Sequence, residues 1–360
     1  MTLWHKFVAV LTVALAVVAA GCGDSGDGNA DTSTNASESK EVVLVTHDSF
    51  AIPKQVKATF EKESGLELTI LQSGDAGEMV NRALLTKGNP QGDVLFGIDN
   101  NLLSRALDEG LFEPYIAAGL EFVDAAYRID PTHAVTPIDH GDVCLNVDRK
   151  WFASHGVAPP QTLADLTQPR YKNLLVVENP ATSTPGLAFM LATIARFGES
   201  AWQDYWRQLR ANGVLAVDGW EEAYTARFSG AGGSNGNRPI VVSYATSPAA
   251  EVIFAKTPPK TAPTAVVTDS CFRQIELAGV LDGAKNPNGA RAFIDFMLSE
   301  QFQAAMPGSM FVLPVREGTP LTEAFQKYAV SPPSPLELPA EEIGSNRDRW
   351  IDEWTQVVLR

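Results

Sequence analysis

The sequence predicts an α/β protein of two lobes, each with a parallel sheet that carries helices on both faces. Short runs of β-branched residues alternate with segments of helical spacing, which is the pattern of such folds. The chain has 360 residues, which is enough for about two domains. Hydrophobic residues make up 45% and charged residues 20%, so the chain can bury a large core and is not of the disordered class.

The first part of the folded chain shows this alternation clearly. The predicted strands are residues 41–46 (EVVLVT), 66–71 and 93–97 (DVLFG). The predicted helices are residues 54–64, 78–86 and 101–109, of which the last is closed by Gly110. This order favours a parallel sheet with helices on both faces.

The same signals return further along the chain. Residues 174–178 (LLVVE) and 240–244 (IVVSY) are predicted strands, and residues 185–197 are a predicted helix. Residues 347–359 predict a packed C-terminal helix because apolar side chains recur there at helical spacing. These side chains are Trp350, Ile351, Trp354, Val357 and Val358.

The N-terminus resembles a bacterial lipoprotein signal. Residues 1–21 place basic residues before an apolar run at 7–20, which is too short for a comfortable membrane span. Small residues lead directly to Cys22, so the resemblance implies cleavage before Cys22 and lipid on its sulfur and amine. The alternative is an ordinary signal peptide in which Cys22 is incidental.

Residues 22–40 are a predicted disordered tether, because residues 23–40 lack any large apolar residue. The expected arrangement is a globular domain that is lipid-anchored to the outer face of the cell membrane. This extracytoplasmic compartment permits disulfides.

The composition excludes several classes of function. Asp and Glu total 43 against 28 Lys and Arg, a formal net charge of −15, which argues against a nucleic-acid binder but not against binding a small cation. Three cysteines are too few for a disulfide-scaffold protein, and no zinc spacing or CxxC pair occurs. We therefore expect neither a metal nor a cofactor. The Gly-rich residues 230–237 lack the Lys-Ser/Thr ending of a phosphate-binding loop and are a predicted surface loop.

Polar, aromatic and acidic residues gather in the loops that follow the strands. This position is informative because ligands of open α/β sheets bind beyond the carboxyl ends of the strands. The candidates are His47, Asp48, Ser49, Asp99, Asn100, Ser183, Thr184, Gly186, Trp220, Tyr224, Tyr244 and Ser247. Asp48, Asp99 and Ser183 also have a structural interpretation as helix caps. Trp220 and Tyr224 have one as core aromatics.

The chemistry of these loops suits a ligand with an aromatic cation at one end and an anion at the other. Aromatic rings stand at His47, Trp220, Tyr224 and Tyr244. Such rings attract an organic cation by roughly 0.5–2 kcal/mol each. Asp48 and Asp99 supply the opposite charge. Hydroxyls and backbone N–H groups at the start of the helix at 185–197 form a site for an anion such as phosphate.

Seven motifs follow one another along residues 42–315. They are HDSF at 47–50, DVLFGIDNNLL at 93–103, GLF at 110–112, ENPATSTPGL at 178–187, GWEEAY at 219–224, SYATSPA at 243–249 and MPGSMFVLPV at 306–315. In this combination they resemble the bacterial periplasmic thiamine-binding proteins, the substrate-binding receptors of thiamine ABC importers.

The resemblance implies a type II periplasmic-binding-protein fold, in which two α/β lobes joined by two crossover strands close over a ligand in the cleft. Lobe 1 is expected at 41–138 plus 270–360, and lobe 2 at 139–269. The implied function is that of a monomer that captures thiamine or a thiamine phosphate by hinge closure. The loaded form would then dock on the permease and ATPase subunits of the importer.

Ligand contacts of the family carry over where the motifs match. The resemblance places Asp48 and Ser49 beside the ring system of the ligand, with Asp99 and Asn100 in a second loop. It assigns Ser183, Thr184 and Gly186 to a phosphate. It makes Trp220, Tyr224 and Tyr244 aromatic walls, with Ser247 beside the last. Two positions depart from the pattern, because His47 replaces a usual Tyr and Phe311 a usual Trp, and the preferred form of the ligand stays open.

The two remaining cysteines follow the two crossovers that the resemblance implies. Crossover strands of this fold run side by side, so Cys144 and Cys271 are expected to be neighbours in space. Because the compartment is oxidising, a Cys144–Cys271 disulfide near the hinge is the prediction. The alternative is a pair of buried free thiols.

Two other functions compete with a receptor for thiamine. One is an enzyme of the same fold that cleaves thiamine, with Cys144 as nucleophile and Asp142 as a nearby acid. That chemistry needs a free thiolate, so a Cys144–Cys271 bridge would exclude it. The other is a receptor of this fold for iron or a polyamine. The prediction is a binding protein without catalysis.

Overall fold

The structure of the protein is a computed structural model that describes residues 39–360. The predicted signal at 1–21, the predicted lipid site Cys22 and residues 22–38 of the predicted tether lie outside these residues. Within the described part, no helix is both long and apolar enough to span a membrane.

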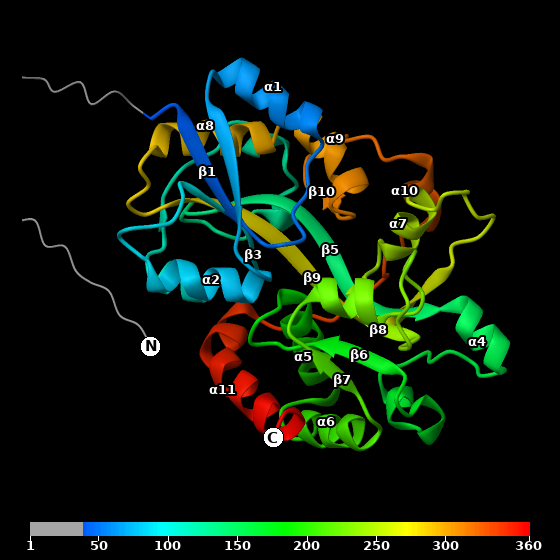
Figure 1. Ribbon diagram of the computed structural model, residues 1–360. Coiled ribbons are helices and arrows are strands. Elements are labelled where there is room, and N and C mark those ends of the chain that lie inside the picture. Colours follow the sequence, from blue (N-terminus) through cyan, green and yellow to red (C-terminus); the bar gives the residue numbers. More distant parts are fainter. Residues whose placement is uncertain (1–38) are drawn as a thin grey trace, which may run out of the picture. The chain divides into compact units, whose positions relative to one another are not determined.

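One mixed sheet organises the described residues (Figure 1). Its main order is β2-β1-β3-β9-β5-β8-β6-β7, while β10 pairs with β5 and β4 pairs with β9. The strands are β1 (Glu41–Thr46), β2 (Glu67–Gln72), β3 (Val94–Asp99), β4 (Phe112–Glu113), β5 (Thr136–Asp148), β6 (Leu175–Glu178), β7 (Leu215–Val217), β8 (Ile240–Tyr244), β9 (Thr264–Leu281) and β10 (Leu313–Pro314). Neighbouring strands are parallel within β2-β1-β3 at one end of the sheet and within β8-β6-β7 at the other end. The predicted parallel pairing is therefore confirmed in both of these parts.

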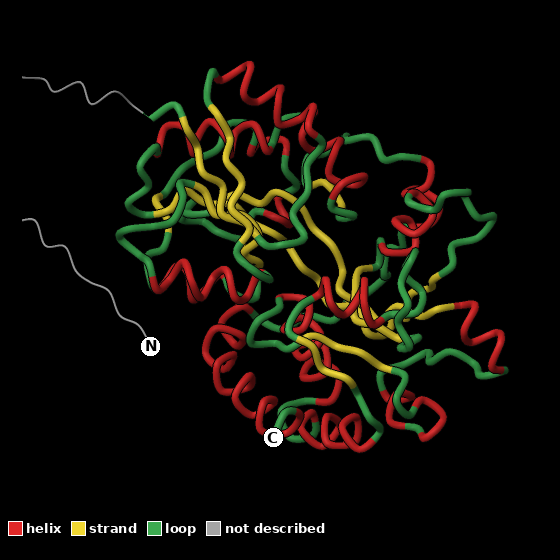
Figure 2. Tube along the Cα trace, viewed as in Figure 1, coloured by secondary structure: helices red, strands yellow, loops and turns green. Residues whose placement is uncertain are grey.

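Two long strands connect these parallel parts. β5 has 13 residues and β9 has 18, and the two pair antiparallel along most of their length. On one side β9 pairs with β3, and on the other side β5 pairs with β8. In Figure 2 both strands run from one part of the sheet into the other. They are therefore the two crossover strands that the resemblance implies.

Helices cover both faces of the sheet (Figure 2). The α-helices are α1 (Lys54–Ser64), α2 (Ala76–Leu85), α3 (Leu103–Asp108), α4 (Arg149–His155), α5 (Thr184–Phe197), α6 (Trp202–Ala211), α7 (Ser247–Ile253), α8 (Pro287–Met297), α9 (Glu300–Ser309), α10 (Glu323–Tyr328) and α11 (Ala340–Val358). Short 3₁₀ helices are η1 (Leu120–Phe122), η2 (Ala125–Tyr127), η3 (Ala164–Thr167) and η4 (Pro169–Tyr171), and η5 (Glu222–Arg227) is a π-helix. One apolar core packs α1, α8 and α9 on β1 and β3, and a second includes α2, α3, α5 and α6.

Local signals explain where several helices begin and end. α1 has the bounds predicted from the sequence and ends at Gly65, whose φ of 70° lies in the left-handed region that favours glycine. α2 begins two residues before the predicted start at 78. The reason is Asp75, whose side chain accepts the N–H of Ala76 and caps the helix there.

The C-terminal helix α11 starts at Ala340, earlier than the predicted start at 347. In its first two turns only Ile343 is buried, so the apolar pattern that predicts a helix is confined to its second half. There Trp354 is buried and meets Trp206 of α6 edge-on, with ring centroids 5.4 Å apart. α11 also contacts α3, so it touches elements on both sides of the crossover strands.

Candidate ligand-binding site

A cavity of about 340 Å³ lies at the carboxyl ends of several strands. The chain segments that follow β1, β6, β7 and β8 contribute to its walls, as expected for a ligand site in an open α/β sheet. Its lining residues are His47, Ser49, Ala51, Asp75, Ala76, Thr184, Pro185, Trp220, Glu221, Tyr224, Thr225, Tyr244, Ser247, Ala250, Glu251, Phe254, Glu276, Ser309, Met310, Phe311 and Val312. Pockets for small molecules measure about 300–1,000 Å³, so this cavity suits a compact ligand.

One wall of the cavity is an aromatic stack. The Trp220 and Tyr224 rings are nearly parallel, with centroids 5.0 Å apart, and Tyr244 meets Trp220 at 61°. Hydrogen bonds fix the stack, because Trp220 Nε1 donates to Ser243 Oγ at 3.0 Å and Tyr224 Oη donates to Glu251 Oε1 at 2.8 Å. The wall is therefore held in place before any ligand arrives.

A second aromatic pair faces the cavity from Phe254 and Phe311. Their ring centroids lie 4.9 Å apart in an edge-to-face arrangement, and Phe254 is 65% exposed. Phe311 has φ of 59°, which is unusual for a bulky residue and is found where the surroundings enforce it. Thr246 holds it by donating its hydroxyl to the Phe311 carbonyl. The strain places an aromatic ring at the cavity.

His47 supplies a neutral ring. It is buried, and burial lowers the pKa of its imidazole to about 4, so it carries no charge at neutral pH. Nδ1 lies 3.1 Å from Ser49 Oγ, and Nε2 lies 3.7 Å from Glu276 Oε1. Gly97 makes room for this ring, because a Cβ at that position would lie 2.4 Å from His47 Cδ2.

Four carboxyl groups line the cavity, at Asp75, Glu221, Glu251 and Glu276, and none of its lining residues is Lys or Arg. Burial raises the pKa of Asp75 to about 6, although Asp75 Oδ2 accepts the Trp220 N–H at 2.9 Å. Burial also raises the pKa of Glu221 and of Glu251. With a pKa of about 6, Asp75 is mostly ionised at neutral pH, and no Lys or Arg of the lining opposes its charge, so an organic cation would be attracted to the cavity.

A row of buried carboxyl groups continues beneath the cavity across three strands. Glu276 of β9 stands opposite Asp99 of β3 and opposite Asp139 of β5. Burial, and then the neighbouring Asp139, raises the pKa of Glu276 well above its usual range. Burial raises the pKa of Asp139 to about 7 and that of Asp99 to about 6. The row is therefore partly protonated at neutral pH, since like charges so close cannot all ionise.

The structure brings many of the predicted site residues together and leaves others aside. Those that line the cavity are His47, Ser49, Thr184, Trp220, Tyr224, Tyr244, Ser247 and Phe311. Asp48 is exposed and does not line it. Asp99 is buried below it, where it accepts the N–H groups of Asn101 and Leu102 at the turn into α3.

Three more predicted residues serve the backbone instead of the cavity. The Asn100 side chain bonds to β9, donating to the Arg273 carbonyl and accepting from the Ile275 N–H. Ser183 caps α5 by accepting the Gly186 N–H, and both residues are buried. The alternative interpretation as a helix cap is confirmed for Ser183 but not for Asp99, because the N-cap of α3 is Leu102 and Asp99 accepts its hydrogen bonds at the turn before that helix.

Several lining residues escaped the sequence analysis. In the sequence Asp75 has the pattern of an ordinary helix cap, and Glu276 lies inside a strand and not in the loop that follows one. Glu251 and Phe254 lie in α7 and at its C-cap, two and five residues beyond the SYATSPA motif at 243–249. A signal existed for Glu221, which lies in the GWEEAY motif, and for Pro185, Ser309, Met310 and Val312, which lie in the motifs at 178–187 and 306–315. In the described part, no group of three or more His, Cys, Asp and Glu side chains is placed to hold a metal ion.

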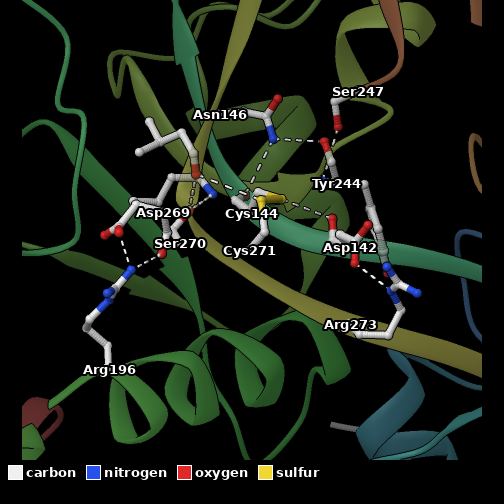
Figure 3. Close-up of a disulfide and its surroundings, with 12 residues drawn as sticks. Asp142, Cys144, Asn146, Arg196, Tyr244, Ser247, Asp269, Ser270, Cys271 and Arg273 are labelled. Atoms are coloured by element: carbon white, nitrogen blue, oxygen red, sulfur yellow. Dashed lines mark hydrogen bonds and ion pairs between the residues drawn. A yellow bond between two sulfur atoms is a disulfide. The ribbon is translucent and has the colours of Figure 1, made fainter. Parts of the chain in front are cut away.

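The predicted disulfide is present (Figure 3). Cys144 of β5 and Cys271 of β9 are bonded across 127 positions of sequence, and both are fully buried. Beside the bridge, Arg273 Nε donates to Asp142 Oδ1 at 2.6 Å. Cys144 is thus not a free thiol, and its pairing removes the nucleophile of the competing enzyme hypothesis.

Residues 89–340 match the family profile of bacterial extracellular solute-binding proteins, and the chain belongs to this class. The solved structure of a periplasmic thiamin binding protein superimposes with a TM-score of 0.78 and 29% identity, covering 89% of this chain and 96% of that one. A ferric binding protein from Campylobacter jejuni shares the fold, with a TM-score of 0.67, 17% identity and coverage of 88% and 99%. The predicted type II periplasmic-binding-protein fold is confirmed.

Within this class, the chain belongs to the family of thiamine-binding periplasmic proteins. It is 32% identical to the thiamine-binding periplasmic protein of Escherichia coli (strain K12) over 324 residues, which cover 89% of this chain and 94% of the relative. It is 30% identical to that of Brucella suis biovar 1 over 90% of this chain and 94% of the relative. These relatives are binding proteins by name.

Proposed function

We propose that this protein is an extracytoplasmic receptor that binds thiamine and delivers it to an ABC importer. The observation that carries the proposal is the cavity, which combines aromatic walls with carboxyl groups and has no Lys or Arg among its lining residues. A flat organic cation is the ligand that such walls recognise, by cation–π attraction and by opposite charge. Thiamine is a cation of this kind, and the names of the relatives favour it.

Capture would occur by closure of two lobes about the crossover strands. We place lobe 1 at 41–138 plus 270–360 and lobe 2 at 139–269. Two backbone N–H groups join these lobes beside the cavity: Trp220 donates to Asp75 Oδ2 at 2.9 Å, and Glu78 donates to the Thr182 carbonyl at 3.0 Å. Opening would break both hydrogen bonds, so a ligand that touches both lobes would favour the closed form.

The partners and the location follow from the same proposal. Lipid on Cys22 would anchor the chain to the outer face of the cell membrane, and residues 22–40 would tether the monomeric receptor near its permease and ATPase. No catalytic step is proposed: the Cys144 sulfur is bonded to Cys271, and neither of these cysteines lines the cavity.

Calorimetric titration of the purified protein with thiamine tests the proposal, with spermidine and ferric citrate as alternative ligands. We expect saturable binding of one thiamine, which is recovered intact from the mixture. Binding of spermidine or iron without thiamine would refute the proposed ligand. Disappearance of thiamine during incubation would refute the absence of catalysis.

A further inference from the structure

A second, smaller cavity lies away from the aromatic walls of the first. It measures about 20 Å³, which is enough for one particle of the size of a water molecule or slightly larger. Helices α2, α3 and α11 surround it together with the segment from Pro180 to the first turn of α5 (Figure 1). Of its lining residues only Thr184 also lines the larger cavity, so the two are separate sites.

Arg347 of α11 brings an unpaired hydrogen-bond donor to this small cavity. Its side chain lines the cavity, and the residue is only 3% exposed. Nε and Nη2 donate to Asp348 Oδ1 at 3.1 and 2.9 Å, whereas Nη1 is buried and has no hydrogen-bond partner among the described residues. A guanidinium only donates. Because an unpaired buried donor costs free energy, Nη1 requires an acceptor.

Arg105 of α3 brings a second guanidinium to the same cavity. It is half-buried, and its Nη1 donates to Asn81 Oδ1 at 2.8 Å, which is a neutral acceptor. The lining contains no Asp or Glu, and the Asp348 side chain that pairs with Arg347 is 74% exposed outside it. The cavity is therefore positively charged, in a chain whose formal net charge is −15.

We infer that the small cavity binds a monatomic inorganic anion, chloride, between Arg105 and Arg347. Hydrogen bonds from a guanidinium to an anion are stronger than those to a neutral acceptor. A water molecule would accept the Nη1 hydrogen but would leave both positive charges uncompensated. The volume of about 20 Å³ favours a monatomic anion over a polyatomic one.

The position of this site links the anion to closure, and this part of the inference rests on the proposed function. Arg105 belongs to lobe 1, and the segment at 180–187 belongs to lobe 2. The two sides touch closely beside the site, because a Cβ at Gly77 of α2 would lie 2.7 Å from the Thr182 carbonyl carbon. Opening would take the cavity apart, so a bound anion favours the closed form. By linkage, chloride and thiamine then strengthen each other's binding.

Bromide diffraction and thermal unfolding test the site without thiamine. Crystals of the protein soaked in sodium bromide should show an anomalous peak between Arg105 and Arg347. In solution, chloride replaces gluconate at constant ionic strength, and we expect a saturable rise of the unfolding midpoint, by about 2 °C at ten times the Kd of chloride. Arg347→Gln and Arg105→Gln should each abolish the rise. Arg349→Gln, which removes an equal charge from α11 outside the lining, should keep it.

Thiamine titrations in the two salts test the link to closure. At the same ionic strength, the Kd of thiamine should be about fivefold lower or more in chloride than in gluconate. In Arg347→Gln and in Arg105→Gln the Kd of thiamine should be equal in both salts, whereas Arg349→Gln should behave as the wild type.

The outcomes separate this inference from the proposed function. A water molecule in place of the anomalous peak would overturn the anion site. A peak without any effect of chloride on unfolding would show binding at crystal concentration only and would overturn it as well, as would equal effects of chloride in the wild type and both lining variants. Equal thiamine affinity in the two salts would overturn the link to closure. If thiamine does not bind at all, the proposed function fails, and the anion site stands on its own tests.

Discussion

The disulfide between the crossover strands offers a direct test of how this fold is stabilised. Replacing Cys144 and Cys271 together by Ala removes the bridge without leaving a buried thiol or hydroxyl. The bridge closes a loop of 127 positions, for which the chain-entropy relation gives a contribution of about 5 kcal/mol, at the upper end of the usual range. We expect the free energy of unfolding of the double variant to be lower by about 3–5 kcal/mol.

Urea unfolding followed by Trp fluorescence measures this loss, with the wild-type protein under reducing conditions as a matched comparison. Reduced wild type should move to the same midpoint as the variant, because both lack the same constraint. An unchanged midpoint in the variant would refute the reasoning. So would two free thiols besides Cys22 in denatured, unreduced wild type, since the bridge would then be absent.

Three further predictions address the site. Trp220→Ala removes a stacking face and should weaken thiamine binding by about 10-fold or more in calorimetry, whereas Trp151→Ala, on α4 outside the lining, should leave it unchanged. Equal affinity in the wild type and both variants would show that Trp220 does not contribute to the site. Burial lowers the pKa of His47 to about 4, so as the pH falls from 6.5 to 4 this histidine takes up a proton in the unfolded chain but not in the folded one, and the free energy of unfolding should fall. Over this pH range His47→Phe should lose about 3 kcal/mol less of its unfolding free energy than the wild type, and parallel pH profiles of the two proteins would contradict the prediction. Gly97→Ala should lower the free energy of unfolding by about 1–3 kcal/mol, because it combines a positive φ with a clash against the His47 ring. The loss should be smaller in Gly156→Ala, where φ is also positive but the added methyl group meets open space, and equal urea midpoints of the two variants would contradict this.

Local patterns in the sequence predicted several strands and helices of the fold. β-branched runs predicted β1 and β3 and the strands β6 and β8, and the spacing of apolar side chains predicted α1 with its bounds. The start of α2 was missed by two residues because a cap is a matter of one side chain and one N–H. The first half of α11 was missed because it has only one buried apolar residue.

The candidate site was predicted only where it follows strands. Trp220, Tyr224 and Tyr244 were found because the ends of parallel strands meet at one edge of a sheet. Asp75 and Glu276 were missed because each looks like part of an ordinary helix start or strand, and only the pairing of distant segments turns them toward the cavity.

By itself, the sequence determined the class of fold, the aromatic character of the site and the family, because strand and helix signals, ring residues and motifs are local properties of the chain. Only the tertiary structure decided which of these residues meet. It placed four carboxyl groups around the cavity without a cationic lining side chain, and it used Ser183 to cap the start of α5. Charge and access depend on distances between segments far apart in sequence, and residue spacing does not contain those distances.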